Sequence, residues 1–130
     1  MADTEVLSQV TVIIVTFNSA HCLPILGKTL AQLPHVIVVD NGSDDDCAAQ
    51  TPAHLPQAQV LALPANLGFG AANNRALVQV QTPFALLLNP DCEITPQAVL
   101  QLLHTASKWP DTAMVAPQLL QPSGQADVNY

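Results

Sequence analysis

The chain has 130 residues, of which 49% are hydrophobic and 10% are charged, so it can bury the core of one domain and is not expected to be disordered. Three basic residues stand against ten acidic ones, which gives a formal charge of −7. This balance argues against nucleic-acid binding and against a basic membrane-surface helix, since both need clustered Lys and Arg. No apolar run approaches the ~20 residues that span a bilayer, and no secretion signal is recognised.

The three cysteines, Cys22, Cys47 and Cys92, are far apart and form no CxxC pair. They give neither a disulfide framework nor a zinc-ligand spacing, so we interpret them as small core side chains in a reducing compartment. We therefore expect a cytoplasmic domain.

Five runs of apolar residues predict β-strands. The first two are continuous and rich in β-branched residues, which is typical of parallel strands buried on both faces. The expected strands are residues 10–15, 36–39, 60–63, 84–88 and 113–116.

Helical segments are predicted between these strands. They are residues 19–33, a solvated acidic turn at 44–46, a turn at 66–70 that opens a helix to about residue 80, and residues 95–108. Ser19, Ser43 and Thr95 are expected to cap three of these segments, and Trp109 to pack the last helix onto the sheet.

The alternation of strands and helices predicts a single α/β domain, residues 1–130, with a doubly wound and mainly parallel sheet. Ligands of such sheets bind beyond the carboxyl ends of the strands. Polar residues follow the predicted strands at these ends, namely Thr16 and Asn18, then Asp40 and Asn41, then Asn66 and Gly68, then Asn89 and Asp91.

Common nucleotide-binding loops are absent. The first strand–helix junction, TFNSAHC, contains no glycine, which disfavours a nicotinamide-dependent Rossmann domain. No G-x-x-x-x-G-K-[ST] loop occurs either.

Two carboxylates, Asp40 and Asp91, follow different strands at the predicted edge. A carboxylate behind a strand end can accept the N3–H of uracil or thymine, or ribose hydroxyls. A second one can hold Mg²⁺ or Mn²⁺ against a diphosphate. A cation is favoured because a chain of charge −7 repels a diphosphate that Arg75 alone cannot neutralise.

Four segments, VTVIIVTFNSA, VIVVDNGSDD, ANLGFGAANNRAL and LLLNPDCEITPQAVL, together resemble the N-terminal half of a family 2 glycosyltransferase of the rhamnosyltransferase-like branch. They occur in the family's order over residues 10–117. The resemblance implies a GT-A fold that binds a nucleoside-diphosphate sugar, a dTDP- or UDP-sugar, together with Mg²⁺ or Mn²⁺. It also implies a saccharide or lipid-linked acceptor and a role in cell-envelope polysaccharide synthesis. The location it implies is the cytoplasm, including a peripheral position at the inner face of the membrane.

The resemblance also assigns residues. It places Thr16, Asn18, Asp40 and Asn41 around the nucleoside, with Asp40 matching the acid that contacts the pyrimidine base. It places Gly68, Asn74 and Arg75 in the segment that closes over the nucleotide. It makes Asp91 the metal-bearing acid, with Asn89 in place of the motif's first acid, so the phosphates are expected to supply much of the coordination.

Family members usually continue into an acceptor-binding half that also carries the general base, whereas this sequence stops at Tyr130. We therefore expect a truncated GT-A domain that binds nucleotide, and we assign no catalytic residue. The alternative is a non-catalytic binding or assembly module whose exposed sheet edge is covered in a homodimer.

Overall fold

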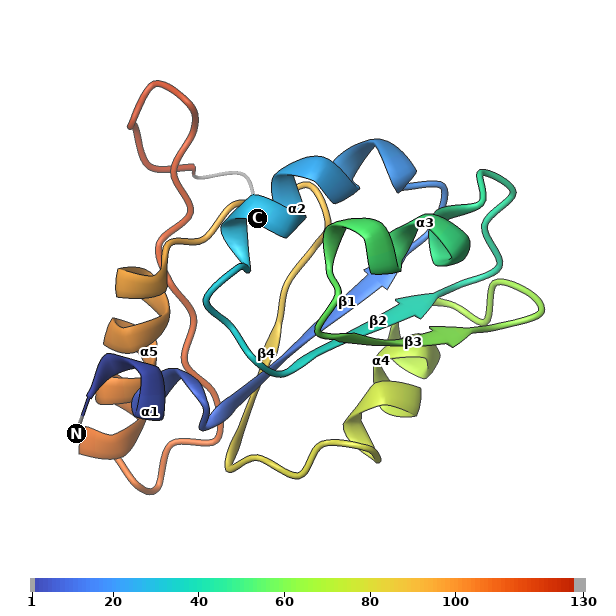
Figure 1. Ribbon diagram of the computed structural model, residues 1–130. Coiled ribbons are helices and arrows are strands. Elements are labelled where there is room, and N and C mark those ends of the chain that lie inside the picture. The colour runs from blue at the N-terminus through green and yellow to red at the C-terminus, as the bar shows by residue number, and fades with distance from the viewer. Residues whose placement is uncertain (1, 128–130) are drawn as a thin grey trace.

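Four parallel strands form the sheet of the computed structural model, which describes residues 2–127 (Figure 1). Their order in the sheet is β3-β2-β1-β4, so the chain moves outward from β1 to β3 and then returns to the other side of β1. The strands are β1 (Val10–Thr16), β2 (Val36–Asp40), β3 (Ala58–Ala62) and β4 (Phe84–Leu87). The predicted α/β fold with a parallel sheet is confirmed.

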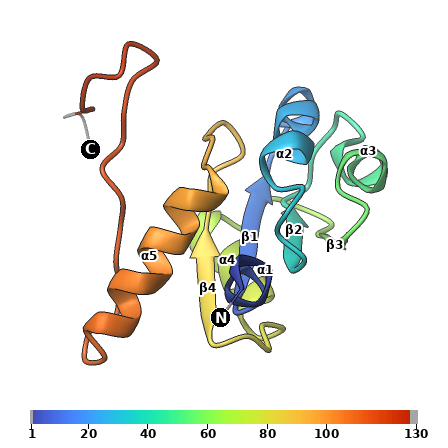
Figure 2. The same ribbon diagram turned by 60° about the vertical axis from the view of Figure 1, so that its left-hand side comes forward.

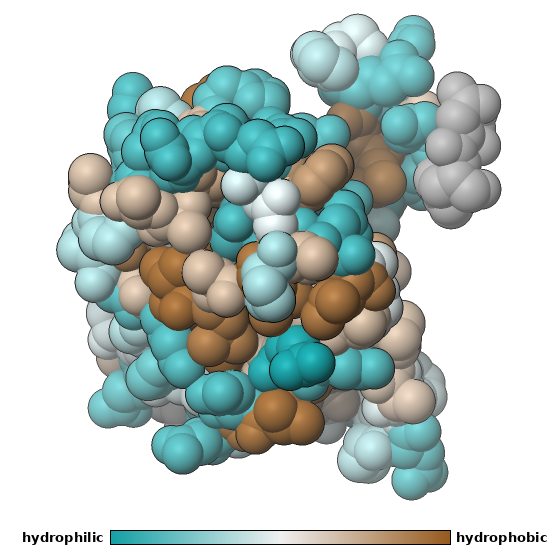
Figure 3. All heavy atoms as spheres, turned by 90° about the vertical axis from the view of Figure 1, so that its right-hand side faces the viewer, coloured by the Kyte–Doolittle hydropathy of each residue, from teal (hydrophilic) through white to brown (hydrophobic). Residues whose placement is uncertain are grey.

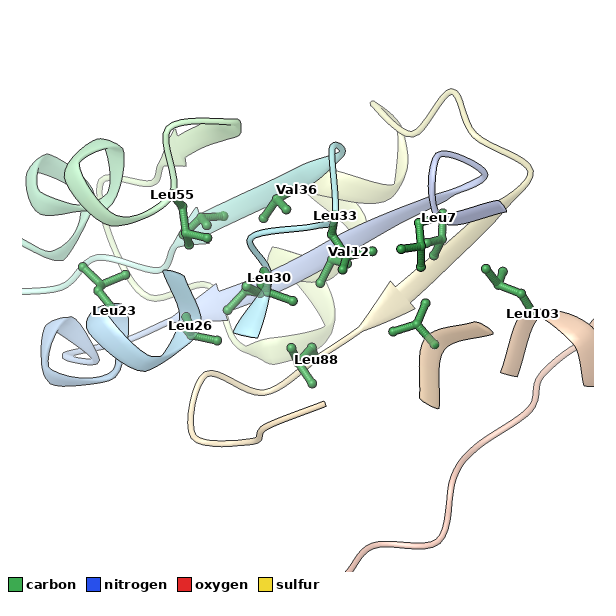
Figure 4. Close-up of a cluster of buried hydrophobic side chains, with 14 of the residues drawn as sticks. Leu7, Val12, Leu23, Leu26, Leu30, Leu33, Val36, Leu55, Leu88 and Leu103 are labelled. Atoms are coloured by element: carbon green, nitrogen blue, oxygen red, sulfur yellow. The ribbon is translucent and has the colours of Figure 1, made fainter. Parts of the chain in front are cut away.

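Helices cover both faces of the sheet. They are α1 (Asp3–Leu7), the 3-10 helix η1 (Ala20–Cys22), α2 (Leu23–Thr29), α3 (Cys47–His54), α4 (Phe69–Leu77) and α5 (Pro96–Lys108). On one face, Val12 and Val36 pack among leucines contributed by α1, α2 and α5 and by the segments that follow α2 and α3 (Figure 4). On the other face, Ile13 and Ile37 pack against Ala72 and Ala76 of α4. Burial on both faces explains why the first two strands are uninterrupted apolar runs.

The strand predicted at residues 113–116 is wrong. After α5 the chain runs as an extended arm beside the body of the molecule (Figure 2), and Met114 is 82% exposed. The arm ends in a single antiparallel bridge between Leu120 and Ala126. A short apolar run becomes a strand only where another strand supplies backbone partners, and within residues 2–127 none pairs with this one.

The prediction that Trp109 packs α5 onto the sheet is also wrong, because this side chain is 62% exposed. Val99 and Leu103 are the buried residues of α5. They are four residues apart and share one face of the helix, whereas Trp109 lies six residues beyond Leu103 and so falls on another face. The predicted Thr95 cap is confirmed, since its hydroxyl accepts a hydrogen bond from the Ala98 N–H at 3.1 Å.

Candidate functional site

The carboxyl ends of the strands bring the loops of the predicted site to one edge of the sheet. Thr16, the last residue of β1, pairs in register with Asp40, the last residue of β2, and Asp40 pairs with Ala62 of β3. Figure 3 looks onto the side toward which these strands point, where hydrophobic side chains gather between hydrophilic ones. The strand order changes direction between β1 and β4, which is where open α/β sheets bind ligands.

Asp40 is held by three hydrogen bonds at this edge. Its Oδ1 accepts from the Thr16 hydroxyl at 2.9 Å and from the Ser43 hydroxyl at 2.6 Å, and its Oδ2 accepts from the Ser43 N–H at 3.2 Å. The Asp40 side chain is nearly buried, with 5% of its surface exposed. Ser43 therefore binds Asp40 and does not cap the acidic turn as predicted.

The loops after β1 and β2 are joined by hydrogen bonds that involve side chains. The Asn18 N–H donates to the Ser43 hydroxyl at 2.9 Å, and the Asn18 Oδ1 accepts from the Asp44 N–H at 2.8 Å. Asn18 adopts a left-handed φ of 51°, a conformation that Asn tolerates better than most residues. Asp45 bridges the same loops, because its Oδ2 accepts from the Ala20 N–H at 2.9 Å.

Two predictions for these loops are wrong. The half-buried Asp45 also accepts the Cys47 N–H at 3.1 Å, so it is not a merely solvated part of the acidic turn. Ser19 donates to the Phe17 carbonyl at 3.1 Å and does not cap the following helix, because its hydroxyl satisfies the turn that precedes η1.

Asn41 connects the loop after β2 to the loop after β3. Its Nδ2 donates to the Asn66 Oδ1 at 3.0 Å and to the Gly68 carbonyl at 3.3 Å, and its Oδ1 accepts from the Leu67 N–H at 2.9 Å. Only 3% of Asn41 is exposed, so its amide orders the loop that opens α4. Gly42 permits the close approach of the two loops, since a Cβ there would lie 2.7 Å from the Ala65 carbonyl carbon.

Asn74 and Arg75 lie on α4 with exposed side chains. Within residues 2–127 no carboxylate pairs with the Arg75 guanidinium, which leaves it available to an anion. Gly68 immediately precedes α4 with a φ of 89°, a conformation that favours glycine. Neighbouring Asn73 is buried and donates to the Phe69 carbonyl at 3.0 Å, so it stabilises the helix.

Asn89 and Asp91 follow β4 and are both exposed. Burial raises the pKa of the Cys22 thiol, and the negative charge of Asp91 raises it further, which places Asp91 near the helical turn after β1. In the same way, burial and then the charges of Asp40 and Asp45 raise the pKa of the Cys47 thiol. Asp91 therefore lies near the segment that follows the neighbouring strand β1, whereas Asp40 and Asp45 lie near the helix that follows their own strand β2.

The donors on the β4 loop are of the kind that Mg²⁺ and Mn²⁺ prefer. Asp91 offers a carboxylate and Asn89 an amide oxygen. The Asp91 carboxylate accepts a weak hydrogen bond from the thiol of the adjacent Cys92 at 3.7 Å. Residues 2–127 contain no group of three or more His, Cys, Asp or Glu side chains that could hold a metal by themselves. A cation here would need further oxygen ligands, which a diphosphate and water can supply.

A cleft of about 560 Å³ lies between α2 and the segment that leads into α5, and it shares no residue with the predicted site. Its charged lining residues are Lys28 and Glu93, and because their charges are opposite, the cleft favours neither anionic nor cationic ligands. None of the helices in residues 2–127 has the length and apolar character that a membrane span requires.

The parallel sheet and the polar loops at its carboxyl edge define an α/β domain of the class whose ligands bind at that edge. Residues 11–125 match the profile described as Glycosyl transferase family 2. The chain therefore belongs to glycosyl transferase family 2, as its four motifs predicted.

Two relatives illustrate this membership. The chain is 30% identical over 100 residues to an N-acetylglucosaminyl-diphospho-decaprenol L-rhamnosyltransferase of Mycobacterium tuberculosis, over 68% of this chain and 33% of that protein. It is 27% identical over 122 residues to an undecaprenyl-phosphate 4-deoxy-4-formamido-L-arabinose transferase of Yersinia enterocolitica, over 85% of this chain and 37% of that protein. The chain spans about a third of the length of these relatives.

Sequence reasoning placed Asn66 at this edge but gave it no role in the site, and it did not assign Ser43 or Asp45 to the site. Ser43 had a signal, because a Ser three residues after a strand-end Asp can bond back to its carboxylate. Asp45 and Asn66 had none, since their partners lie 25 residues away in other loops.

Proposed function

We propose that this chain is the donor-binding part of a family 2 glycosyltransferase and that it binds a nucleoside-diphosphate sugar, a UDP- or dTDP-sugar, at the carboxyl edge of its sheet. The observation that supports this most is the arrangement of the edge, where the loops after β1, β2 and β3 are joined and Asp91 is exposed on the loop after β4.

The proposed nucleoside pocket lies at the joined loops. Thr16, Asn18 and Asn41 shape it through the bonds described above, and Asp40 contacts the base. Phe17 is 49% exposed between Thr16 and Asn18 and offers a flat apolar surface beside them. Because these side chains are already hydrogen-bonded, little ordering is needed when a nucleotide binds.

The proposed diphosphate site lies at Asp91, on the loop after β4 where the strand order changes direction. Asp91 and Asn89 would hold Mg²⁺ or Mn²⁺, and a bound cation would stabilise the negative charge of the departing diphosphate. Arg75 and Asn74 contribute a positive charge and an amide from the segment that Gly68 opens. Without a cation, the formal charge of −7 opposes the binding of a diphosphate.

The proposed acceptor is lipid-linked, because the names of both relatives specify a polyprenyl carrier, decaprenol in one and undecaprenyl phosphate in the other. The proposed location is accordingly the cytoplasm or the inner face of its membrane. Envelope polysaccharide synthesis is the process in which we place such a transfer.

Calorimetric titration of the chain with UDP, dTDP, ADP and GDP at a fixed Mn²⁺ concentration tests the proposal. UDP and dTDP are expected to bind at least tenfold more tightly than the purine nucleotides, a preference of about 1.4 kcal/mol. Equal affinity for all four nucleotides, or no binding of any, would contradict it.

The second candidate, a non-catalytic assembly module, is favoured by one observation. Leu87 on β4 is 47% exposed, and within residues 2–127 no strand pairs with the outer edge of β4. Such an edge can pair with a second copy of the chain. An obligate dimer in size-exclusion chromatography that neither binds UDP nor cleaves UDP-sugars would favour this candidate, whereas nucleotide binding by a monomer would exclude it.

A further inference from the structure

The hydrogen bonds around Asp40 limit what this carboxylate can still bind. An ionised carboxylate has about four acceptor positions on its two oxygens. Three are occupied in the structure, two on Oδ1 by the hydroxyls of Thr16 and Ser43 and one on Oδ2 by the Ser43 N–H. Asp40 can therefore accept about one more hydrogen bond from a ligand.

The direction of the Ser43 hydroxyl is also fixed. Its oxygen accepts the Asn18 N–H at 2.9 Å, and its single proton is donated to the Asp40 Oδ1 at 2.6 Å. The Asp44 N–H in turn holds the side chain of Asn18 at 2.8 Å. Ser43 therefore occupies Oδ1 and links Asp40 to the loop after β1.

One acceptor position selects among the groups of a nucleotide. Uracil and thymine present a single N3–H between two carbonyl groups. Cytosine presents an unprotonated N3, which a carboxylate repels. Guanine presents adjacent N1–H and N2–H donors, and a ribose diol presents two hydroxyls, so both leave a donor unpaired here, at a cost.

We propose that Ser43 is a positioning residue that, with Thr16, occupies three acceptor positions of Asp40 and so holds its one free position toward the N3–H of the base that the proposed function places there. This inference rests on the proposed function, because it assumes that a nucleotide binds at this edge.

The test compares UDP with its N3-methyl and 2′-deoxy derivatives in calorimetric titrations of the 130-residue chain with Mn²⁺. N3-methylation removes the donor and is expected to weaken binding at least tenfold, as the loss of a hydrogen bond to a charged group does. Removal of the 2′-hydroxyl is expected to change affinity less than threefold. The opposite ranking would place Asp40 against the ribose and overturn the inference, while nucleotide binding itself would stand.

Variants then test the role of Ser43. Ser43→Ala frees a second acceptor position and releases Asp40, so the penalty for N3-methylation is expected to fall to about threefold or less. Ser43→Thr keeps the hydroxyl and is expected to restore the penalty. Equal weakening of UDP and N3-methyl-UDP in Ser43→Ala would show a merely structural role and overturn the inference.

Two further measurements keep the outcomes distinct. Thermal denaturation verifies that each variant is folded. If Ser43→Ala does not fold, Thr16→Val takes its place, because it removes the other hydroxyl donor to Asp40 and is also expected to lower the penalty for N3-methylation. If the unaltered chain binds neither UDP nor dTDP, the proposed function fails and the inference falls with it.

Discussion

The connection that Asn41 makes between the loops after β2 and β3 can be tested by removing its side chain. Asn41→Ala deletes three hydrogen bonds, of 2.9, 3.0 and 3.3 Å. Their partner residues Asn66, Leu67 and Gly68 are exposed, so water can replace the lost bonds in part. At about 1 kcal/mol for each bond, and less for the long one, the free energy of unfolding should fall by about 2–3 kcal/mol.

Urea denaturation followed by circular dichroism measures this change, and Asn74→Ala is the matched control. Asn74 is exposed on α4, so its replacement should alter the free energy of unfolding by less than about 0.5 kcal/mol. Asn41→Asp keeps the acceptor for the Leu67 N–H but replaces the donor with a second acceptor, and it should cost at least as much as Asn41→Ala. If Asn41→Ala and Asn74→Ala have the same stability, the reasoning is refuted.

Three more predictions concern the stability of the chain. Gly42→Ala places a Cβ 2.7 Å from the Ala65 carbonyl carbon at a φ of 80°, and it should lower the free energy of unfolding in urea by more than about 2 kcal/mol. Gly70→Ala in α4 is the control, because its Cβ would meet nothing within 4 Å, and it should be neutral or stabilising by up to about 1 kcal/mol. Equal effects of the two substitutions would contradict this prediction. Thr95→Ala removes the cap of α5 and should cost about 1 kcal/mol, whereas Thr105→Ala inside the same helix should not, and a neutral Thr95→Ala would count against the cap. Burial raises the pKa of the Cys47 thiol above its usual value of 9.0, so the unfolded chain loses this proton at a lower pH than the folded chain does. Thermal stability should therefore fall as the pH rises above about 9, and it should fall less in Cys47→Ala. The same fall in Cys47→Ala as in the unaltered chain would refute this cause.

The strands that the sequence predicted best are those whose composition reports burial. β1 and β2 are uninterrupted β-branched runs because helices cover both of their faces, and the structure places them within one residue of the prediction. Residues 113–116 (AMVA) are also apolar but contain one β-branched residue, and they form no strand, since strand formation depends on a pairing partner that local composition does not reveal. The short helix α1 was not predicted, because five residues give no helical periodicity.

The positions of the site residues were more predictable than their hydrogen bonds. Strand ends determine which residues meet at an edge, so the sequence could place Thr16 and Asp40 together. It could not show that Asn41 faces the loop after β3, because that depends on how two loops pack 25 residues apart. The proposed role of Asn41 in nucleotide binding is therefore an indirect one, through the order of this loop.

The most direct test of the central proposal, that a cation on Asp91 lets an acidic chain bind a diphosphate, is a calorimetric titration of UDP with and without Mn²⁺. Mn²⁺ is expected to tighten UDP binding at least tenfold in the unaltered chain and in Glu93→Ala, a neighbouring exposed carboxylate, but not in Asp91→Ala. Because Asp91 is exposed, the variant should keep its thermal stability within about 0.5 kcal/mol. The same Mn²⁺ dependence in Asp91→Ala as in the unaltered chain would contradict the proposal.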